Sequence, residues 1–86
     1  MAVLKLPRLL EGSVRGGLRH EVPAGTLEQA LNDLFEREPG LRNHILDESG
    51  AIRPHVILFV DGNRAMLETV VPERGAIQVL QAVSGG

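Results

Sequence analysis

The sequence predicts an α+β domain in which one main amphipathic helix packs across one face of a mixed β-sheet. Two observations support this: strand-like segments precede and follow the helix, and the helix has a single apolar stripe. A helix with one apolar side must bury that side against another element, and the available partner is a sheet. With 86 residues the chain has the size of one domain, and we expect residues 1–86 to form it.

A β-hairpin is predicted at the start of the chain. Val3–Leu6 is apolar and is followed by Pro7, a residue that is tolerated at strand ends. Leu18–Val22 alternates between apolar and charged residues, which is typical of a half-buried strand. The segment between them, Glu11–Gly17, contains three glycines and is predicted to be a turn.

The main helix has a recognisable start, stripe and end. Thr26 and Gln29 have the S/T-x-x-E/Q spacing of a capping box, which satisfies free amides at a helix start. Pro39-Gly40 predicts that the helix ends at about Glu38. The apolar stripe consists of Leu27, Ala30, Leu31, Leu34 and Phe35.

The strongest strand signal is His55–Val60, because it is rich in β-branched residues and is closed by the turn dipeptide Asp61-Gly62. The remaining predicted elements are a short helical turn at Leu41–Leu46, a loop at Asp47–Ala51, an edge strand around Ala65–Leu67, a turn at Pro72–Gly75 and a last strand at Ala76–Val83.

The His55–Val60 strand is apolar on both of its sides, although one helix covers only one face of a sheet. If Val56, Leu58 and Val60 face the helix, Ile57 and Phe59 lie on the open face. Leu80 of the last strand is a candidate to join them. An exposed apolar patch of this kind predicts a partner-docking surface. The alternative is that a loop or a second copy covers Phe59.

The internal residues offer little for catalysis or metal binding. The chain has no cysteine, which excludes disulfides and thiolate sites. His20, His44 and His55 lie in separate elements without the i, i+4 spacing of a helical metal site, so we expect no metal. The Glu11–Gly17 glycines lack the spacing of a phosphate-binding loop.

Composition also limits the partners and the compartment. A net charge of −2 gives no electrostatic reason to expect a nucleic acid or an anionic membrane. No apolar run approaches the ~20 residues that span a bilayer, and the first ten residues lack the apolar core of a signal peptide. We therefore expect a cytoplasmic protein.

The sequence closes with "SGG", directly after the last predicted strand. Gly85 and Gly86 have no Cβ, so this segment could lie extended in a channel too narrow for a side chain. The α-carboxylate of Gly86 could then reach a nucleotide held by another protein and attack its α-phosphorus. The alternative is that these glycines are a disordered terminus or a cloning remnant.

Several segments, taken together and in order, resemble the MoaD/ThiS family of ubiquitin-like sulfur carriers, and most of all its CysO-like branch. They are "VPAGTLEQAL" at the helix start, "PGLRNHIL", the strand and turn "VILFVDG", and the ending "VPERGAIQVLQAVSGG". The resemblance covers essentially the whole chain. It implies the ubiquitin-like β-grasp fold, with a flexible tail over residues 83–86.

The resemblance also implies a function. A ubiquitin-activating-type enzyme would use ATP to adenylate Gly86, and a sulfur donor would convert the acyl-adenylate to a thiocarboxylate for a sulfur-accepting biosynthetic enzyme. The chain would be a cosubstrate without a bound cofactor, and not an enzyme. Gly85 and Gly86 match the family's ending, Ser84 and Val83 would thread the partner, and Phe59 matches a position on the family's open sheet face.

Some questions stay open at the level of sequence. The segment Asn63–Val71 is shorter than is usual in the family, which affects partner docking. The recipient pathway could be that of cysteine, thiamin, molybdopterin or a thio-metabolite. A protein modifier that forms isopeptide bonds through Gly86 shares the first chemical step. A β-grasp interaction domain without tail chemistry would depend on Ile57 or Phe59 instead, and a small enzyme would require the three histidines to converge.

Overall fold

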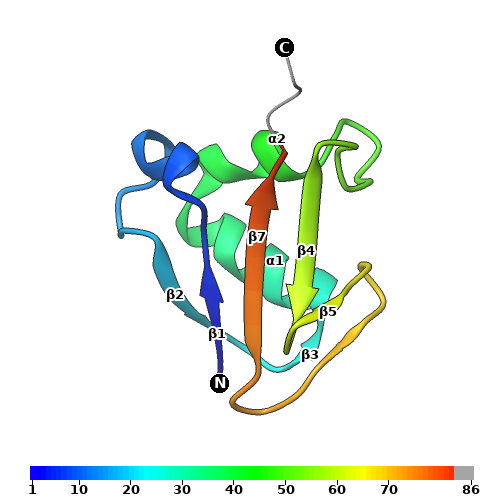
Figure 1. Cartoon of the computed structure of the whole chain (residues 1–86). Helices are drawn as coiled ribbons and strands as arrows, with labels where there is room; N and C mark the ends of the chain where they lie inside the picture. Colours follow the sequence, from blue (N-terminus) through cyan, green and yellow to red (C-terminus); the bar gives the residue numbers. More distant parts are fainter. Residues whose placement is uncertain (83–86) are drawn as a thin grey trace.

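The computed structural model describes residues 1–82, and within them a mixed five-stranded sheet forms one layer (Figure 1). Its strand order is β2-β1-β7-β4-β5. The neighbouring strands β1 and β7 run parallel, and the other neighbours are antiparallel. The strands are β1 (Ala2–Lys5), β2 (Arg19–Val22), β4 (Val56–Val60), β5 (Asn63–Arg64) and β7 (Ala76–Gln81). A separate two-stranded ribbon pairs β3 (Gly25–Thr26) with β6 (Val70–Val71).

The main helix, α1 (Leu27–Arg37), lies across one face of this sheet, as predicted. Its capping box is confirmed: the Gln29 amide donates to Thr26 Oγ1 at 3.2 Å, and the Thr26 amide donates to Gln29 Oε1 at 2.9 Å. The helix ends at Arg37 with Glu38 as its cap. The short helical segments η2 (Pro39–Leu41) and α2 (Arg42–Ile45) follow, close to the expected helical turn.

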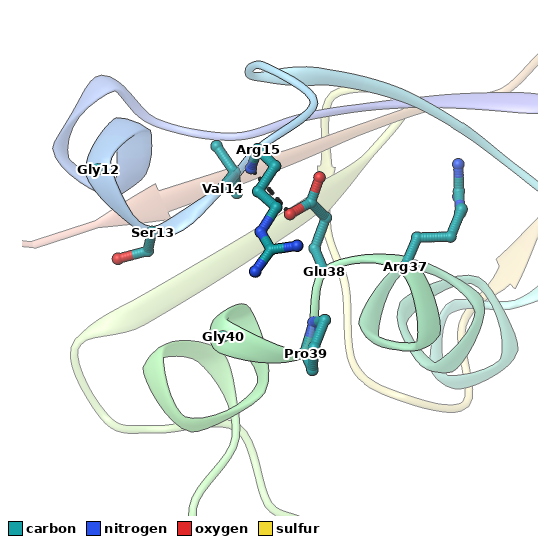
Figure 2. A pocket seen from close by; sticks show the side chains of 8 residues that line it. All are labelled: Gly12, Ser13, Val14, Arg15, Arg37, Glu38, Pro39 and Gly40. Carbon is teal, nitrogen blue, oxygen red and sulfur yellow. Dashed lines mark hydrogen bonds between the residues drawn. The ribbon is translucent and has the colours of Figure 1, made fainter.

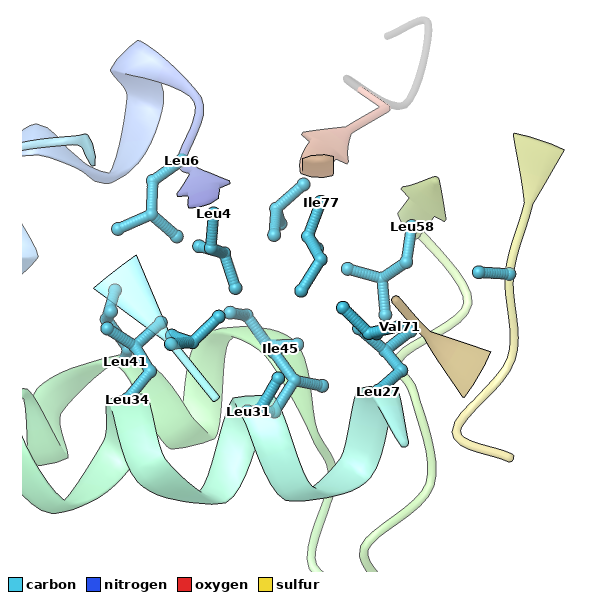
Figure 3. Close-up of a cluster of buried hydrophobic side chains, with 14 of the residues drawn as sticks. Leu4, Leu6, Leu27, Leu31, Leu34, Leu41, Ile45, Leu58, Val71 and Ile77 are labelled. Atoms are coloured by element: carbon cyan, nitrogen blue, oxygen red, sulfur yellow. The ribbon is translucent and has the colours of Figure 1, made fainter. Parts of the chain in front are cut away.

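The hydrophobic core fills the space between α1 and the sheet (Figure 3). All five predicted stripe residues of α1 are buried. They pack against side chains from β1, β4 and β7. The largest fully buried side chains of the core include Leu31 and Leu34 from the helix and Leu4, Leu58 and Ile77 from the sheet. Because these aliphatic side chains come from nearly every element, the core holds the two layers together.

The link between β1 and β2 differs from the predicted turn. A 3₁₀ helix, η1 (Arg8–Ser13), begins three residues earlier than the predicted turn Glu11–Gly17. The Leu10 amide donates to Pro7 O at 3.0 Å, which turns the Leu10 side chain into the core, where it is 2% exposed. Burial of Leu10 therefore explains the helical turn that the glycine content did not reveal.

The predicted edge strand at Ala65–Leu67 was placed too late in the chain. Asp61 (φ 49°) and Gly62 (φ 85°) have the left-handed backbone of a type I′ turn, which puts Asn63 directly opposite Val60. Pairing therefore starts at Asn63, in β5. The last strand also ends earlier than predicted, at Gln81, and the predicted position Val83 lies outside the described residues.

Within residues 1–82, no helix has both the length and the apolar character needed to cross a membrane.

Candidate functional site

The predicted reactive segment, Val83, Ser84, Gly85 and Gly86, lies outside the described residues, as does the predicted flexible tail 83–86. The described chain leads up to this segment through β7, a strand with neighbours on both sides. The Ala82 amide donates to His55 O at 2.8 Å, so backbone pairing continues to the last described residue. The segment that carries Gly86 therefore follows a firmly paired central strand.

The three predicted docking residues lie together on the open face of the sheet. Ile57 pairs with Leu80 across the β4–β7 ladder, and Phe59 pairs with Gln78. Ile57 and Phe59 are half-buried and Leu80 is 38% exposed, whereas Leu58 between them is buried in the core. The orientation predicted for this strand is confirmed. The docking role of the apolar strip (Ile57, Phe59 and Leu80) stays a prediction.

A second feature of the molecule is a buried carboxylate that the sequence did not single out (Figure 2). Glu38 accepts two backbone hydrogen bonds, from the Arg15 amide at 2.9 Å and from the Gly16 amide at 2.8 Å. A Cβ at residue 16 would lie 3.0 Å from Glu38 Oε2, so glycine permits this close approach. Glu38 thereby ties the loop before β2 to the end of α1.

The hydrogen bonds to Glu38 also shift its titration. The Arg15 and Gly16 amides lower the pKa of Glu38 below the ordinary 4.5, assisted by the charges of His20 and Arg15 and opposed by desolvation. The negative charge of an acidic residue at the carboxyl end of a helix interacts unfavourably with the helix dipole. That mismatch is the one sequence signal that could have marked Glu38 as a residue with a partner elsewhere.

The structure does not bring the three histidines into one constellation. His20 Nε2 contacts Gly17 O at 2.8 Å, His44 Nε2 contacts Ser13 Oγ at 3.1 Å, and His55 is exposed before β4. Among residues 1–82, no group of three or more His, Cys, Asp or Glu side chains is arranged to hold a metal ion. Within residues 1–82 the His20 ring contacts a backbone carbonyl and the His44 ring contacts a serine hydroxyl, and the three rings do not form a shared site.

The sequence matches no protein-family model and no curated protein at a significant level. Solved structures do match it over nearly its full length. CysO in the Amycolatopsis orientalis BexX/CysO complex has a TM-score of 0.89 at 20% identity, with 100% of both chains covered. Mycobacterium tuberculosis CysO, described as an antigen, has a TM-score of 0.86 at 20% identity, covering 96% of this chain and 100% of that one.

A third match is SAMP1 from Haloferax volcanii, with a TM-score of 0.80 at 24% identity, covering 99% of this chain and 98% of that one. At these identities the likeness establishes the fold. The β-grasp architecture expected from the sequence is therefore confirmed along the whole described chain.

Proposed function

We propose that this β-grasp chain is a sulfur carrier whose Gly86 α-carboxylate is adenylated and then converted to a thiocarboxylate. The observation that carries the proposal is the whole-chain structural likeness to CysO, combined with a glycine pair that follows the central strand β7. The sequence resemblance to the MoaD/ThiS family supports the same conclusion from the residues themselves.

The proposed chemistry takes place on the chain's last carboxylate. A carboxylate oxygen of Gly86 attacks the α-phosphorus of ATP, pyrophosphate leaves, and an acyl-adenylate forms. Hydrosulfide from the sulfur donor then attacks the acyl carbon, AMP leaves, and a thiocarboxylate remains. The two glycines suit this role because a side chain at either position would obstruct a narrow channel to the nucleotide.

The chain acts in this proposal as a cosubstrate and binds no cofactor of its own. ATP belongs to the adenylating partner, and the sulfur leaves to a biosynthetic enzyme. One structural neighbour, CysO of Amycolatopsis orientalis, was solved in a complex with another protein, BexX. That complex supports the expectation that this chain works by docking to a partner protein.

A second candidate is protein modification, in which the activated Gly86 forms an isopeptide bond with a lysine of another protein. It is favoured by the neighbours called small archaeal modifier protein 1. One of them, from Methanosarcina acetivorans, has a TM-score of 0.82 at 23% identity, covering 99% of this chain and 95% of that chain. The carrier and the modifier share adenylation and differ in the nucleophile that follows.

The experiment that tests the shared step is ATP–pyrophosphate exchange with the host's adenylating enzyme. The full chain should support exchange, and a variant without Gly86 should not, since its carboxylate would lie one residue short. A Gly86 deletion that exchanges pyrophosphate as fast as the full chain would rule out both candidates. A sulfide donor, or a persulfide donor with a thiol reductant, then separates the two candidates, because only the carrier accumulates a thiocarboxylate.

A further inference from the structure

Strand β2 forms one edge of the five-stranded sheet, and within residues 1–82 no strand pairs with its outward side (Figure 1). The Leu6 amide donates to Leu18 O at 2.7 Å, so the backbone of Leu18 faces β1. Backbone groups of successive residues alternate in direction along an antiparallel ladder. The amides and carbonyls of Arg19 and Glu21 therefore face away from β1.

A side-chain contact confirms this outward direction. Arg37 Nη2 donates to the Glu21 carbonyl at 2.7 Å and to Asp33 Oδ2 at 2.8 Å. A carbonyl oxygen has two lone pairs, so the Glu21 carbonyl can accept a second hydrogen bond. The Arg19 amide, the Arg19 carbonyl and the Glu21 amide have no backbone partner in the described chain. This edge therefore presents both donors and acceptors to a further strand.

The side chains of the same two residues carry opposite charges. Arg19 and Glu21 are exposed, and among the described residues neither belongs to an ion pair. Arg19 lies opposite Lys5 of β1, and like charges in directly opposite positions destabilise a sheet. A carboxylate placed beside Arg19 from the outer side would relieve this repulsion.

A second copy of β2, laid antiparallel along this edge, matches both the backbone and the charges. Arg19 of each copy then lies opposite Glu21 of the other copy. Both residues have outward backbone groups, so each pair exchanges both of its backbone hydrogen bonds. The two side chains lie on the same face of the extended sheet, where opposite charges in facing positions are stabilising.

Other registers of this pairing are unfavourable. A shift by two residues places Arg19 opposite Arg19, or Glu21 opposite Glu21. The second of these also sets Arg19 against Pro23, which has no amide to donate. A shift by one residue opposes outward backbone groups with inward ones and exchanges the faces of the side chains. The residues of β2 therefore specify a single register.

We propose that two copies of this chain pair edge to edge through β2 and form one continuous sheet. The same strand contributes to both sides, so the contact is isologous and closes at two copies. It is short, because Pro23 follows β2 directly, and a small interface gives weak, reversible association. Strand β1 separates β2 from β7, so the strand that leads to Gly86 takes no part in the pairing.

Sedimentation equilibrium of the full chain tests the proposal between about 0.02 mM and about 1 mM, where weak dimers dissociate and form. The variants are Arg19→Glu and Glu21→Arg. Two controls change the net charge by the same amounts at exposed positions away from β2. Arg64→Glu lies on the opposite edge strand, β5, and Glu36→Arg lies on α1.

The unmodified chain and both controls should form dimers toward the upper end of this range. Each single variant should weaken association at least about 10-fold, because it opposes like charges at both symmetric positions. The double variant Arg19→Glu/Glu21→Arg should associate like the unmodified chain. An equimolar mixture of the two single variants should associate as well, because opposite charges face each other again.

Amide hydrogen exchange followed by NMR tests the backbone pairing separately from the charges. The Arg19 and Glu21 amides should exchange more slowly at about 1 mM than in dilute solution, because pairing protects them. The His20 amide already faces β1 and should change little. Association without this protection would show that the copies meet elsewhere and would overturn the proposal.

Thermal unfolding excludes a trivial loss of association. Arg19→Glu removes the cation that faces Lys5, so its midpoint should not fall below that of the unmodified chain. A chain that stays monomeric at about 1 mM would overturn the pairing of copies, as would single variants that associate as strongly as their controls. Protection of the Arg19 and Glu21 amides only after the adenylating enzyme is added would assign this edge to that partner instead. None of these outcomes depends on pyrophosphate exchange, which tests the proposed function.

Discussion

At the scale of single residues, Glu38 shows how a charged side chain can organise a small domain. Its two carboxylate oxygens accept hydrogen bonds from consecutive backbone amides, those of Arg15 and Gly16, and the side chain is almost fully covered. The carboxylate thus accepts from two consecutive amides of an irregular loop that lies outside the strand ladders. Glu38 therefore defines the shape of the loop that enters β2.

The shifted titration of Glu38 leads to a pH prediction. Because the pKa of Glu38 is lower in the folded chain than its ordinary 4.5, the ionised form stabilises the fold above that value. This stabilisation should be lost as pH falls below about 4.5 and through the folded-state pKa. Thermal unfolding between pH 7 and pH 3 should show a steeper loss of midpoint in the unmodified chain than in Glu38→Gln.

At pH 7 the Glu38→Gln variant should unfold at a lower temperature, because an amide has one acceptor oxygen for two backbone donors. Glu36→Gln, at an exposed position of α1, is the control and should unfold near the midpoint of the unmodified chain. Equal midpoints for Glu38→Gln and Glu36→Gln at pH 7 would contradict the role given to Glu38.

The capping box of α1 and the contacts of Glu38 differ in how far the sequence could predict them. Thr26 and Gln29 are three residues apart and contact each other's backbone, so their spacing alone predicts the capping box. The partners of Glu38 are amides more than twenty residues away. Backbone donors carry no residue identity, and the contact exists only once the sheet has brought the loop to the end of α1.

At the scale of elements, the capping box at the start of α1 is predicted to contribute measurably to stability. Thr26→Ala removes the Oγ1 acceptor of the Gln29 amide and should cost about 1 kcal/mol. In a domain of this size that corresponds to a fall in Tm of roughly 4–8 °C. Thr26→Ser keeps an acceptor oxygen and should retain most of the stability. Equal Tm values for the Ala and Ser variants would show that the cap contributes nothing.

Strand β4 gives a second element-scale prediction, because neighbouring residues face opposite sides of the sheet. Leu58 is 1% exposed in the core, so Leu58→Ala should lower the free energy of unfolding by about 2–5 kcal/mol. Phe59→Ala, on the open face, should cost less stability and weaken binding to the adenylating enzyme more strongly. Chemical denaturation and titration calorimetry measure the two effects. The reverse order in both measurements would contradict the assignment of faces.

The elements that sequence analysis placed well are those with local signals of sufficient length. The stripe and cap of α1 and the apolar run of β4 each span enough residues to show a period. The two-residue strands β3 and β6 have no period of their own and exist because Gly25 and Val71 meet in space. The 3₁₀ helix η1 likewise depends on burial of Leu10, which is a property of the assembled core.

At the scale of the whole molecule, the described residues form a continuous buried core. Its members run from Ala2 in β1 to Val79 in β7. Deletion of residues 83–86 should therefore leave Tm within about 2 °C of the full chain, a shift that corresponds to less than ~0.5 kcal/mol. The same deletion should abolish adenylation. A calorimetric Tm that falls far below that of the full chain would show that these residues also stabilise the fold.

The sequence predicted the fold more completely than it predicted the surface features of the molecule. The order of the predicted segments, the capping box of the helix and the alternation of apolar and polar residues in the strands together predicted a mixed sheet under one helix. Structural matches over nearly the full length of the chain confirm the β-grasp architecture. The predicted docking residues Ile57, Phe59 and Leu80 were placed on the open face of the sheet by the strand period alone. The surface hollow lined by Lys5, Arg19 and Arg74 near the start of β7 could not be predicted, because these residues come from three distant segments that only the sheet and its adjoining turn bring together.

Intact mass spectrometry of the full chain tests the central claim most directly. The chain is incubated with ATP, the host's adenylating enzyme and either a sulfide donor or a persulfide donor with a thiol reductant, and a chain without Gly86 is treated in parallel. The sulfur-carrier proposal predicts that the full chain gains the mass difference between one sulfur and one oxygen atom, that fragmentation locates this gain at Gly86, and that the truncated chain gains nothing. An unchanged full-chain mass, with an enzyme shown to form the Gly86 adenylate, would contradict it.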